Sequence, residues 1–209
     1  MGHSVVIASV IAVLGAGRAV EAQGLVDLGA GIAFAGVATV GDFWGEGVRD
    51  IGGELHVTIS GSPRLGLEVA TTVGRRSIEQ RSYYQDDPGH RVEGGEVTRT
   101  EGMYSVTVRQ KFGPDGPSRS FAFAHYGLAG FFSLTSRTAL RQTFGNGNSY
   151  TSPAEKYARN KFGFPLVGAG FQRALTSRLA VRSDASVLWF LWIPVGFRAS
   201  ATLVVPLGR

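Results

Sequence analysis

The chain has 209 residues, a length that a single domain normally occupies. It contains 30 glycines, about twice the usual share, and its charged residues, at 18%, fall below the usual quarter. The net charge of +5 comes from scattered arginines rather than a basic run, which argues against a nucleic-acid-binding protein. Cysteine is absent, so disulfides and cysteine-ligated zinc sites are excluded.

Histidines are too few and too scattered to indicate a metal site. The four are His3, His56, His90 and His125, and no two of them have the spacing of helical metal ligands. We therefore expect neither a metal nor a cofactor.

The N-terminal residues resemble a signal peptide. Residues 4–16 are apolar or small, and Val20 and Ala22 stand at the positions that a signal peptidase reads, which predicts cleavage before Gln23. A membrane anchor is the alternative, but the apolar run is shorter than the roughly 20 residues of an ordinary span. We expect a signal peptide over 1–22 and one domain over 23–209. That domain has no apolar stretch long enough for a membrane helix, so it can meet a membrane only through strands.

Alternating apolar and polar residues recur along the rest of the chain. Such alternation indicates β-strands, because successive side chains of a strand point to opposite faces. In chain order, the segments lie at 26–34, 54–60, 65–75, 98–110, 120–132, 166–172, 179–189 and 195–207. Seven assign their faces clearly, whereas 120–132 fits either way. The sequence therefore predicts an all-β domain of eight strands.

The last of these segments shows the alternation most clearly. One face carries the apolar row Val195, Phe197, Ala199, Ala201, Leu203, Val205 and Leu207. The other carries Gly196, Arg198, Ser200 and Thr202. The environment that each face meets decides whether the domain is soluble or lies in a membrane.

The connections between these segments differ in length. Three are short and rich in turn residues, at 61–64, 113–119 and 176–178, and longer polar segments lie between them at 41–52, 77–95 and 135–162. The last connection, around 191–194, is brief. Within the last, Ser152 before Pro153 and Glu155 resembles a helix start. In an antiparallel barrel the short turns fall at one end and the long loops at the other, which is typical of outer-membrane barrels.

Aromatic residues gather where the strands are expected to end. Near the long loops lie Phe43, Trp44, Tyr83, Tyr84, Phe131, Phe132, Phe162, Phe164, Trp189 and Trp192, and near the short turns lie Phe112, Phe121 and Phe171. Two such groups predict the aromatic girdles of a membrane barrel.

Taken together, these patterns resemble the small eight-stranded outer-membrane β-barrels of the OmpA and OmpX type. The likeness covers residues 23–209 and rests on layout, ending in the strand GFRASATLVVPL at 196–207. It implies an antiparallel up-and-down transmembrane barrel in the outer membrane of a Gram-negative bacterium, expected as a monomer. The family usually ends in an aromatic residue read by the outer-membrane assembly machinery, whereas this chain ends in Pro206, Leu207, Gly208 and Arg209.

In this arrangement the apolar rows face lipid and the charged rows face the barrel interior. The predicted interior network consists of Asp27, Glu54, Glu68, Arg76, Arg99, Glu101, Arg109, Arg182, Asp184 and Arg198. Acids and arginines balance there, as buried charges require. We expect Arg198 to lie over Gly29 and Gly31 and to pair with Asp27 or Asp184.

No enzymatic signature stands out. His125 with Ser133 and Glu101 could be imagined as a triad, but such triples arise freely by spacing. His90, beside Asp86 and Asp87, fits a solvated loop. We expect no catalysis.

We therefore expect a structural or surface-interaction role, with a polar, plugged interior and long external loops. A possible loop contact consists of Arg137, Arg141, Lys156, Arg159 and Lys161, which would attract lipopolysaccharide phosphates or an acidic partner. Outer-membrane lipid is the other expected partner, and nucleic acid is not expected. Two alternatives remain, namely a soluble lipocalin-like barrel that binds an apolar ligand and a narrow, low-conductance channel.

Overall fold

The computed structural model describes residues 25–37, 49–78, 89–113, 120–190 and 193–207. The expected signal peptide over 1–22 lies outside these residues, as do Asp86 and Asp87. Eleven strands run through the described chain: β1 (Leu25–Val37), β2 (Arg49–Ser60), β3 (Leu65–Ile78), β4 (Arg91–Gly94), β5 (Val97–Phe112), β6 (Phe121–Arg137), β7 (Leu140–Thr143), β8 (Ser149–Ser152), β9 (Glu155–Ala174), β10 (Ala180–Phe190) and β11 (Ile193–Leu207).

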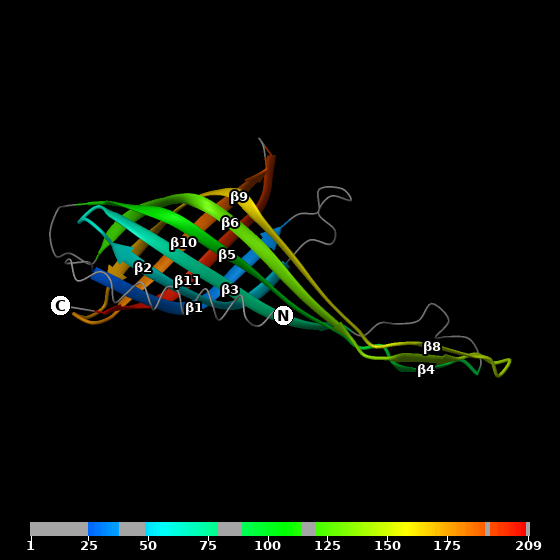
Figure 1. Ribbon diagram of the computed structural model, residues 1–209. Coiled ribbons are helices and arrows are strands. Elements are labelled where there is room, and N and C mark those ends of the chain that lie inside the picture. The colour runs from blue at the N-terminus through cyan, green and yellow to red at the C-terminus, as the bar shows by residue number, and fades with distance from the viewer. Residues whose placement is uncertain (1–24, 38–48, 79–88, 114–119, 191–192, 208–209) are drawn as a thin grey trace.

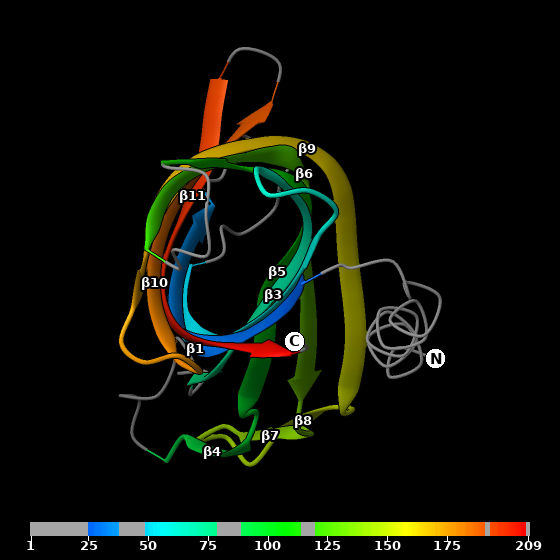
Figure 2. The same ribbon diagram turned by 90° about the vertical axis from the view of Figure 1, so that its left-hand side faces the viewer.

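Eight of these strands close into a barrel, which confirms the predicted fold class. Their order around the ring is β1-β11-β10-β9-β6-β5-β3-β2, and every neighbouring pair is antiparallel. Figure 2 looks onto the end of the ring near the C-terminus, where β11 lies beside β1. The eight alternating segments of the sequence fall on these eight strands, one segment to each.

Four of the barrel strands continue beyond the ring on one side. Pairing of β2 with β3 stops at Gly53 and Val73, and pairing of β10 with β9 stops at Leu188 and Leu166. In contrast, β3, β5, β6 and β9 stay paired as far as Ile78, Val97, Arg137 and Glu155. We call this four-stranded continuation of the wall the extension (Figure 1).

A small distal sheet of order β4-β7-β8 lies at the far end of the extension (Figure 1). Two backbone hydrogen bonds connect the chain segments between this sheet and the extension. Gly95 N–H donates to the Ala139 carbonyl (3.1 Å), and Thr138 N–H donates to the Glu96 carbonyl (3.0 Å). The segment 135–162, expected as a loop, is therefore largely strand, and the segment 77–95 contains the end of β3 and the whole of β4. The helix start expected near Ser152 is wrong, because residues from Glu155 onward form β9 and pair with β6.

No helix within the described residues is long and apolar enough to cross a membrane.

The two faces of the barrel wall differ sharply in chemistry. Exposed outward side chains include Leu28, Ile32, Leu55, Leu67, Val106, Val167, Leu203 and Val205, whereas the alternate positions on the same strands are buried inside. Arg198 is 1% exposed and its neighbours Phe197 and Ala199 point outward, so the arginine face of the last strand is the inner one. The structure thus has an apolar exterior, and charged side chains are buried in its interior.

Two irregularities interrupt the alternation. The register of β10 and β11 shifts between Leu188 and Trp189, and Val195 is buried although it was expected in the outward apolar row. On β9, Phe164 pairs with Ala129 and Phe162 with the next residue, Gly130, so Gly163 is an extra residue. Its φ of +105° suits glycine, and the bulge turns Phe162 outward and Phe164 inward.

Candidate functional site

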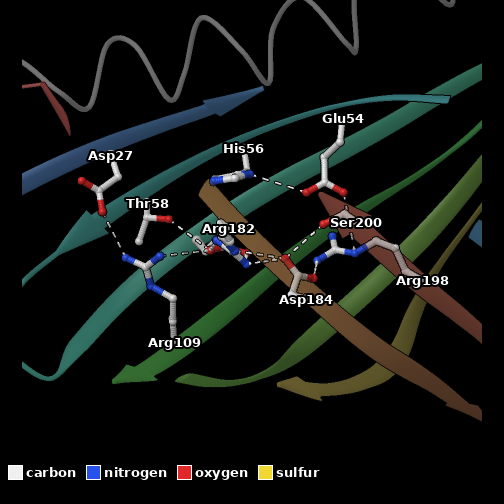
Figure 3. A network of polar contacts seen from close by, with 10 residues as sticks. Asp27, Glu54, His56, Thr58, Arg109, Arg182, Asp184, Arg198 and Ser200 are labelled. Carbon is white, nitrogen blue, oxygen red and sulfur yellow. Dashed lines mark hydrogen bonds and ion pairs between the residues drawn. The ribbon is translucent and has the colours of Figure 1, made fainter. Parts of the chain in front are cut away.

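A chain of buried ion pairs crosses the barrel interior, with Arg182 at its centre (Figure 3). Arg182, on β10, donates to both carboxylate oxygens of Glu68 on β3, with Nη2 2.9 Å from Oε1, and its Nε donates to Asp184 Oδ2 at 3.0 Å. This bidentate geometry is the strongest arrangement open to an arginine and a carboxylate. The pair therefore links opposite walls of the barrel.

Asp184 extends the chain of contacts toward the last strand. Its Oδ1 accepts a hydrogen bond from Arg198 Nη2 at 2.8 Å, and its Oδ2 accepts one from Ser200 at 3.1 Å. Arg198 Nε also lies 3.9 Å from Glu54 Oε2, and Glu54 Oε1 lies 3.5 Å from His56 Nδ1. One carboxylate thus connects two arginines, and a second connects an arginine to a histidine.

Toward the short turns, Arg109 on β5 continues the network. Its Nη2 donates to Asp27 Oδ2 at 3.3 Å, and its Nη1 lies 3.9 Å from Glu68 Oε2. Thr58 donates to the same Glu68 oxygen at 3.0 Å. The charged side chains named so far come from β1, β2, β3, β5, β10 and β11, so the network ties together six of the eight strands.

The ring of Phe123 on β6 packs against the guanidinium groups of two of the arginines. The guanidinium carbon of Arg182 lies 4.4 Å from the centre of its ring, and that of Arg109 lies 5.6 Å away. Arg109, Arg182 and Arg198 are each at most 1% exposed. Three fully buried guanidiniums are costly unless each has charged or π partners, and here each has them.

The remaining members of the predicted network lie elsewhere. Arg99 and Glu101 sit farther along β5 within the extension, and Arg99 Nη1 lies 3.5 Å from Glu101 Oε1. The side chain of Arg76 lies outside the described residues. The ten residues therefore include one connected interior cluster and an ion pair within the extension.

The expected position of Arg198 over two glycines is wrong. In the pairing of β11 with β1, Arg198 lies opposite Ala35, whereas Gly29 lies opposite Val204 and Gly31 opposite Thr202. The space above Gly29 is filled by the His56 ring, whose Cε1 lies 2.1 Å from where a Cβ would stand. Of its two expected partners, Arg198 contacts Asp184, and Asp27 is held by Arg109.

Four further residues line this cluster, and of these only Ser200 stands in the inner row named above, beside Arg198. They are His56, Thr58, His125 and Ser200, all buried. His56 and Thr58 share the strand parity of Glu54, so alternation alone could have placed them inside. For His125 no such signal exists, because β6 carries none of the predicted interior charges and its alternation fits either way.

An apolar layer lies inside the wall beyond the charges, toward the long-loop end. It consists of Met103, Ala129, Phe131, Phe164, Leu166, Leu188 and Val195, with Phe190 packed against it. Phe131 and Phe164 stack with ring centres 4.7 Å apart. The two were expected in an outward aromatic girdle, but their burial inside shows that this part of the girdle prediction is wrong.

The other aromatic residues divide between exposed and undescribed positions. Phe112, Phe162 and Phe171 are exposed, Phe121, Phe132 and Trp189 are partly exposed, and Phe43, Trp44, Tyr83, Tyr84 and Trp192 lie outside the described residues. Phe162 stacks on Tyr104 with ring centres 5.6 Å apart, and the Tyr104 hydroxyl donates to Asn160 at 2.8 Å. This outward cluster lies where the barrel wall passes into the extension.

The basic residues expected as a loop contact are distributed over two sheets. Arg141 belongs to β7 in the distal sheet, while Arg137 lies on β6 and Lys156, Arg159 and Lys161 lie on β9. Lys156 has the strand parity of the outward Asn160 and Phe162, whereas Arg159 and Lys161 have the opposite parity. The five cations therefore do not form one patch.

The conceivable catalytic triple is not assembled. Glu101 and Ser133 are direct partners on β5 and β6, but His125 lies eight residues away along β6, roughly 26 Å at the rise of a strand. His125 is instead buried against Gly168 and Phe123. His90 packs edge-on against Phe144, with ring centres 5.2 Å apart.

No protein-family model matches the chain, and no curated protein matches its sequence. Among solved structures, it is similar to Ail of Yersinia pestis in complex with the heparin analogue sucrose octasulfate, with 14% identity, a TM-score of 0.49, and coverage of 88% of this chain and 99% of Ail. It is also similar to the N-terminal β-barrel domain of Pseudomonas aeruginosa OprF (11% identity, TM-score 0.44, coverage 88% and 100%) and to Neisserial surface protein A (12%, 0.36, 90% and 98%).

At these identities the likeness concerns the fold alone. The eight-stranded fold itself is established by the strand order and closure described above. The resemblance to small outer-membrane barrels inferred from the sequence is therefore confirmed at the level of the fold.

Proposed function

We propose that the protein spans the outer membrane of a Gram-negative bacterium as a monomeric barrel with a structural or surface-interaction role. The observation that carries this proposal is the contrast between the exposed apolar exterior and the buried ion-pair network. In water, an exterior of this kind would promote aggregation, whereas lipid solvates it. The soluble lipocalin-like alternative requires the apolar rows to face inward, and here they face outward.

The two ends of the apolar belt on the outer surface of the barrel support the same placement. Outward polar side chains replace it at both ends, with Gln110 and Arg173 near the short turns and Arg75 and Asn160 near the extension. A closed barrel leaves no unpaired strand edge within such a belt, which a lipid environment requires. We place the short turns in the periplasm and the extension outside the cell.

We further propose that the interior is filled and does not conduct solutes. Eight strands enclose little more than their own side chains. Three buried arginines with their carboxylates occupy the interior nearer the short turns. The stacked Phe131 and Phe164 belong to an apolar layer nearer the extension. The protein would then act through its outer surface and its extension, in contact with outer-membrane lipid and lipopolysaccharide, after a cleaved signal peptide and the assembly machinery deliver it.

Single-channel recording in planar lipid bilayers tests whether the interior is filled. The purified, folded protein should give no stable conductance steps, while a porin inserted under the same conditions should give them. Regular steps from preparations that migrate as a single folded species would instead support the narrow-channel alternative.

A further inference from the structure

The extension has an inner face that continues the lining of the barrel. On β5, Arg99 and Glu101 have the parity of the buried Ser105 and Arg109, and on β6, Ser133 and Arg137 have the parity of the buried His125. Directly opposed residues of antiparallel strands share a face. Because Ser133 opposes Arg159 and Arg137 opposes Glu155, the inner face also carries the odd-numbered residues of β9.

Positive charge predominates on this inner face. Among the described residues it holds four cations from three strands, Arg99, Arg137, Arg159 and Lys161, and two carboxylates, Glu101 and Glu155. Glu101 is engaged by Arg99 at 3.5 Å, and both are largely buried. Glu155 opposes Arg137 at the far end of the face. The cation left most accessible is Arg159, which is exposed.

Arg159 lies beside an exposed aromatic ring. Tyr157 is 43% exposed, and the guanidinium carbon of Arg159 lies 5.6 Å from the centre of its ring. A guanidinium binds carboxylate, sulfate or phosphate groups through two parallel hydrogen bonds, and an aromatic face packs against the C–H groups of a sugar ring. Together, Arg159 would contact the acidic group of an acidic sugar unit and Tyr157 would contact its ring.

We propose that the inner face of the extension binds an acidic saccharide arriving from the external medium, with Arg159 and Tyr157 as its main contacts. This deepens the surface-interaction role proposed above and rests on it. Lipopolysaccharide surrounds the barrel laterally, so it would meet the outer face, where Lys156 lies, whereas the inner face continues the lining of the barrel.

The free edge of β9 does not favour a polypeptide partner. Within the described chain, residues 155–165 of β9 pair with β6 only. That edge carries the Gly163 bulge, Pro165 and several charged residues, which are the features that natural proteins use to prevent strand addition.

The test measures binding of dextran sulfate to the full-length protein in detergent micelles by calorimetry, with neutral dextran as the uncharged control. We expect Arg159→Gln to weaken binding about tenfold, as the loss of a charge-assisted contact would. Lys156→Gln removes the same charge from the other face of the same strand and should change Kd less than about twofold. Tyr157→Ala should also weaken binding, while Tyr157→Phe retains it.

Several results would overturn the inference. Equal losses in Arg159→Gln and Lys156→Gln would mean attraction by net charge alone. Polyglutamate binding as tightly as dextran sulfate would point to a polypeptide partner, and equal dependence on Arg159 for lipopolysaccharide would move the source to the membrane. Each variant is first checked for a boiling-dependent gel shift. A wild-type protein that shifts but does not bind dextran sulfate refutes only this inference, whereas one that does not shift refutes the membrane barrel as well.

Discussion

Asp184 illustrates how single residues hold the barrel interior together. Its two oxygens accept hydrogen bonds from Arg182, Arg198 and Ser200, and its side chain is fully buried. Removing this carboxylate leaves two guanidiniums without their shared partner in a site that water does not reach. The cost of breaking a buried ion pair in this way is about 3–5 kcal/mol.

Asp184→Leu should therefore lower the free energy of unfolding by about 3–5 kcal/mol. The measurement is urea unfolding of the protein in detergent or lipid. Ser183→Leu is the matched control, because Ser183 precedes Asp184 on β10 but is exposed on the outward face, where leucine suits lipid. Equal stabilities for the Asp184 variant and the wild type would show that the network contributes nothing.

Gly168 tests how tightly the interior is packed. A Cβ at this position would stand 2.0 Å from His125 Nε2 and 2.5 Å from the Ala185 carbonyl oxygen, and the latter belongs to backbone that cannot rotate away. Gly168→Ala should destabilise the barrel by about 1–3 kcal/mol, as overpacking does. Gly53→Ala, where a Cβ would meet nothing within 4 Å, should be tolerated in the same unfolding experiment. Comparable losses in both variants would contradict a steric origin.

At the residue scale, alternation in the sequence was enough to place the charges inside but not to pair them. Arg198 and Asp184 share the parity of buried positions, so their location follows from period two. Their partners depend on the stagger between strands, which sets Arg198 opposite Ala35 rather than near Gly29. Stagger is a property of the closed ring, and a single strand carries no sign of it.

At the scale of strands, bulges decide which aromatic rings meet. The extra residue Gly163 lets Phe162 face outward onto Tyr104 while Phe164 faces inward onto Phe131. Both residues were expected in the same girdle because both lie near the end of the strand, and strict alternation also puts residues 162 and 164 on one face. A glycine in a strand often marks such a bulge, but the sequence contains too many glycines for this one to stand out.

The stacked rings of Phe131 and Phe164 should contribute more together than separately. We expect a coupling free energy of about 0.5–1.5 kcal/mol between Phe131→Ala and Phe164→Ala in a double-mutant cycle of unfolding. The outward pair Tyr104 and Phe162, replaced in the same way, provides a comparison on the other face. Additive losses for Phe131 and Phe164 would mean that the stacking in the apolar layer is energetically irrelevant.

The extension was the element least visible in the sequence. Both faces of β9 between Glu155 and Asn160 are exposed, so no apolar row marks a strand there, and Pro153 before Glu155 imitates a helix start. Pairing with β6 overrides this local signal, because backbone hydrogen bonds continue from the barrel into the extension.

At the scale of the whole molecule, the account depends on closure. The pairing of β1 with β11 brings together strands that lie more than 150 residues apart, and it encloses the charges that six strands contribute. Eight alternating segments and two classes of connection were enough to predict this ring. We expect this ring to resist unfolding in mild detergent, because each barrel strand pairs with two neighbours.

The most direct test of this closed membrane barrel is cell fractionation followed by gel migration with and without boiling. We expect the protein to sediment with outer membranes and to change mobility when boiled, since the closed ring should stay folded in the gel detergent until it is heated. A protein recovered in the soluble periplasmic fraction, with the same mobility before and after boiling, would contradict the account.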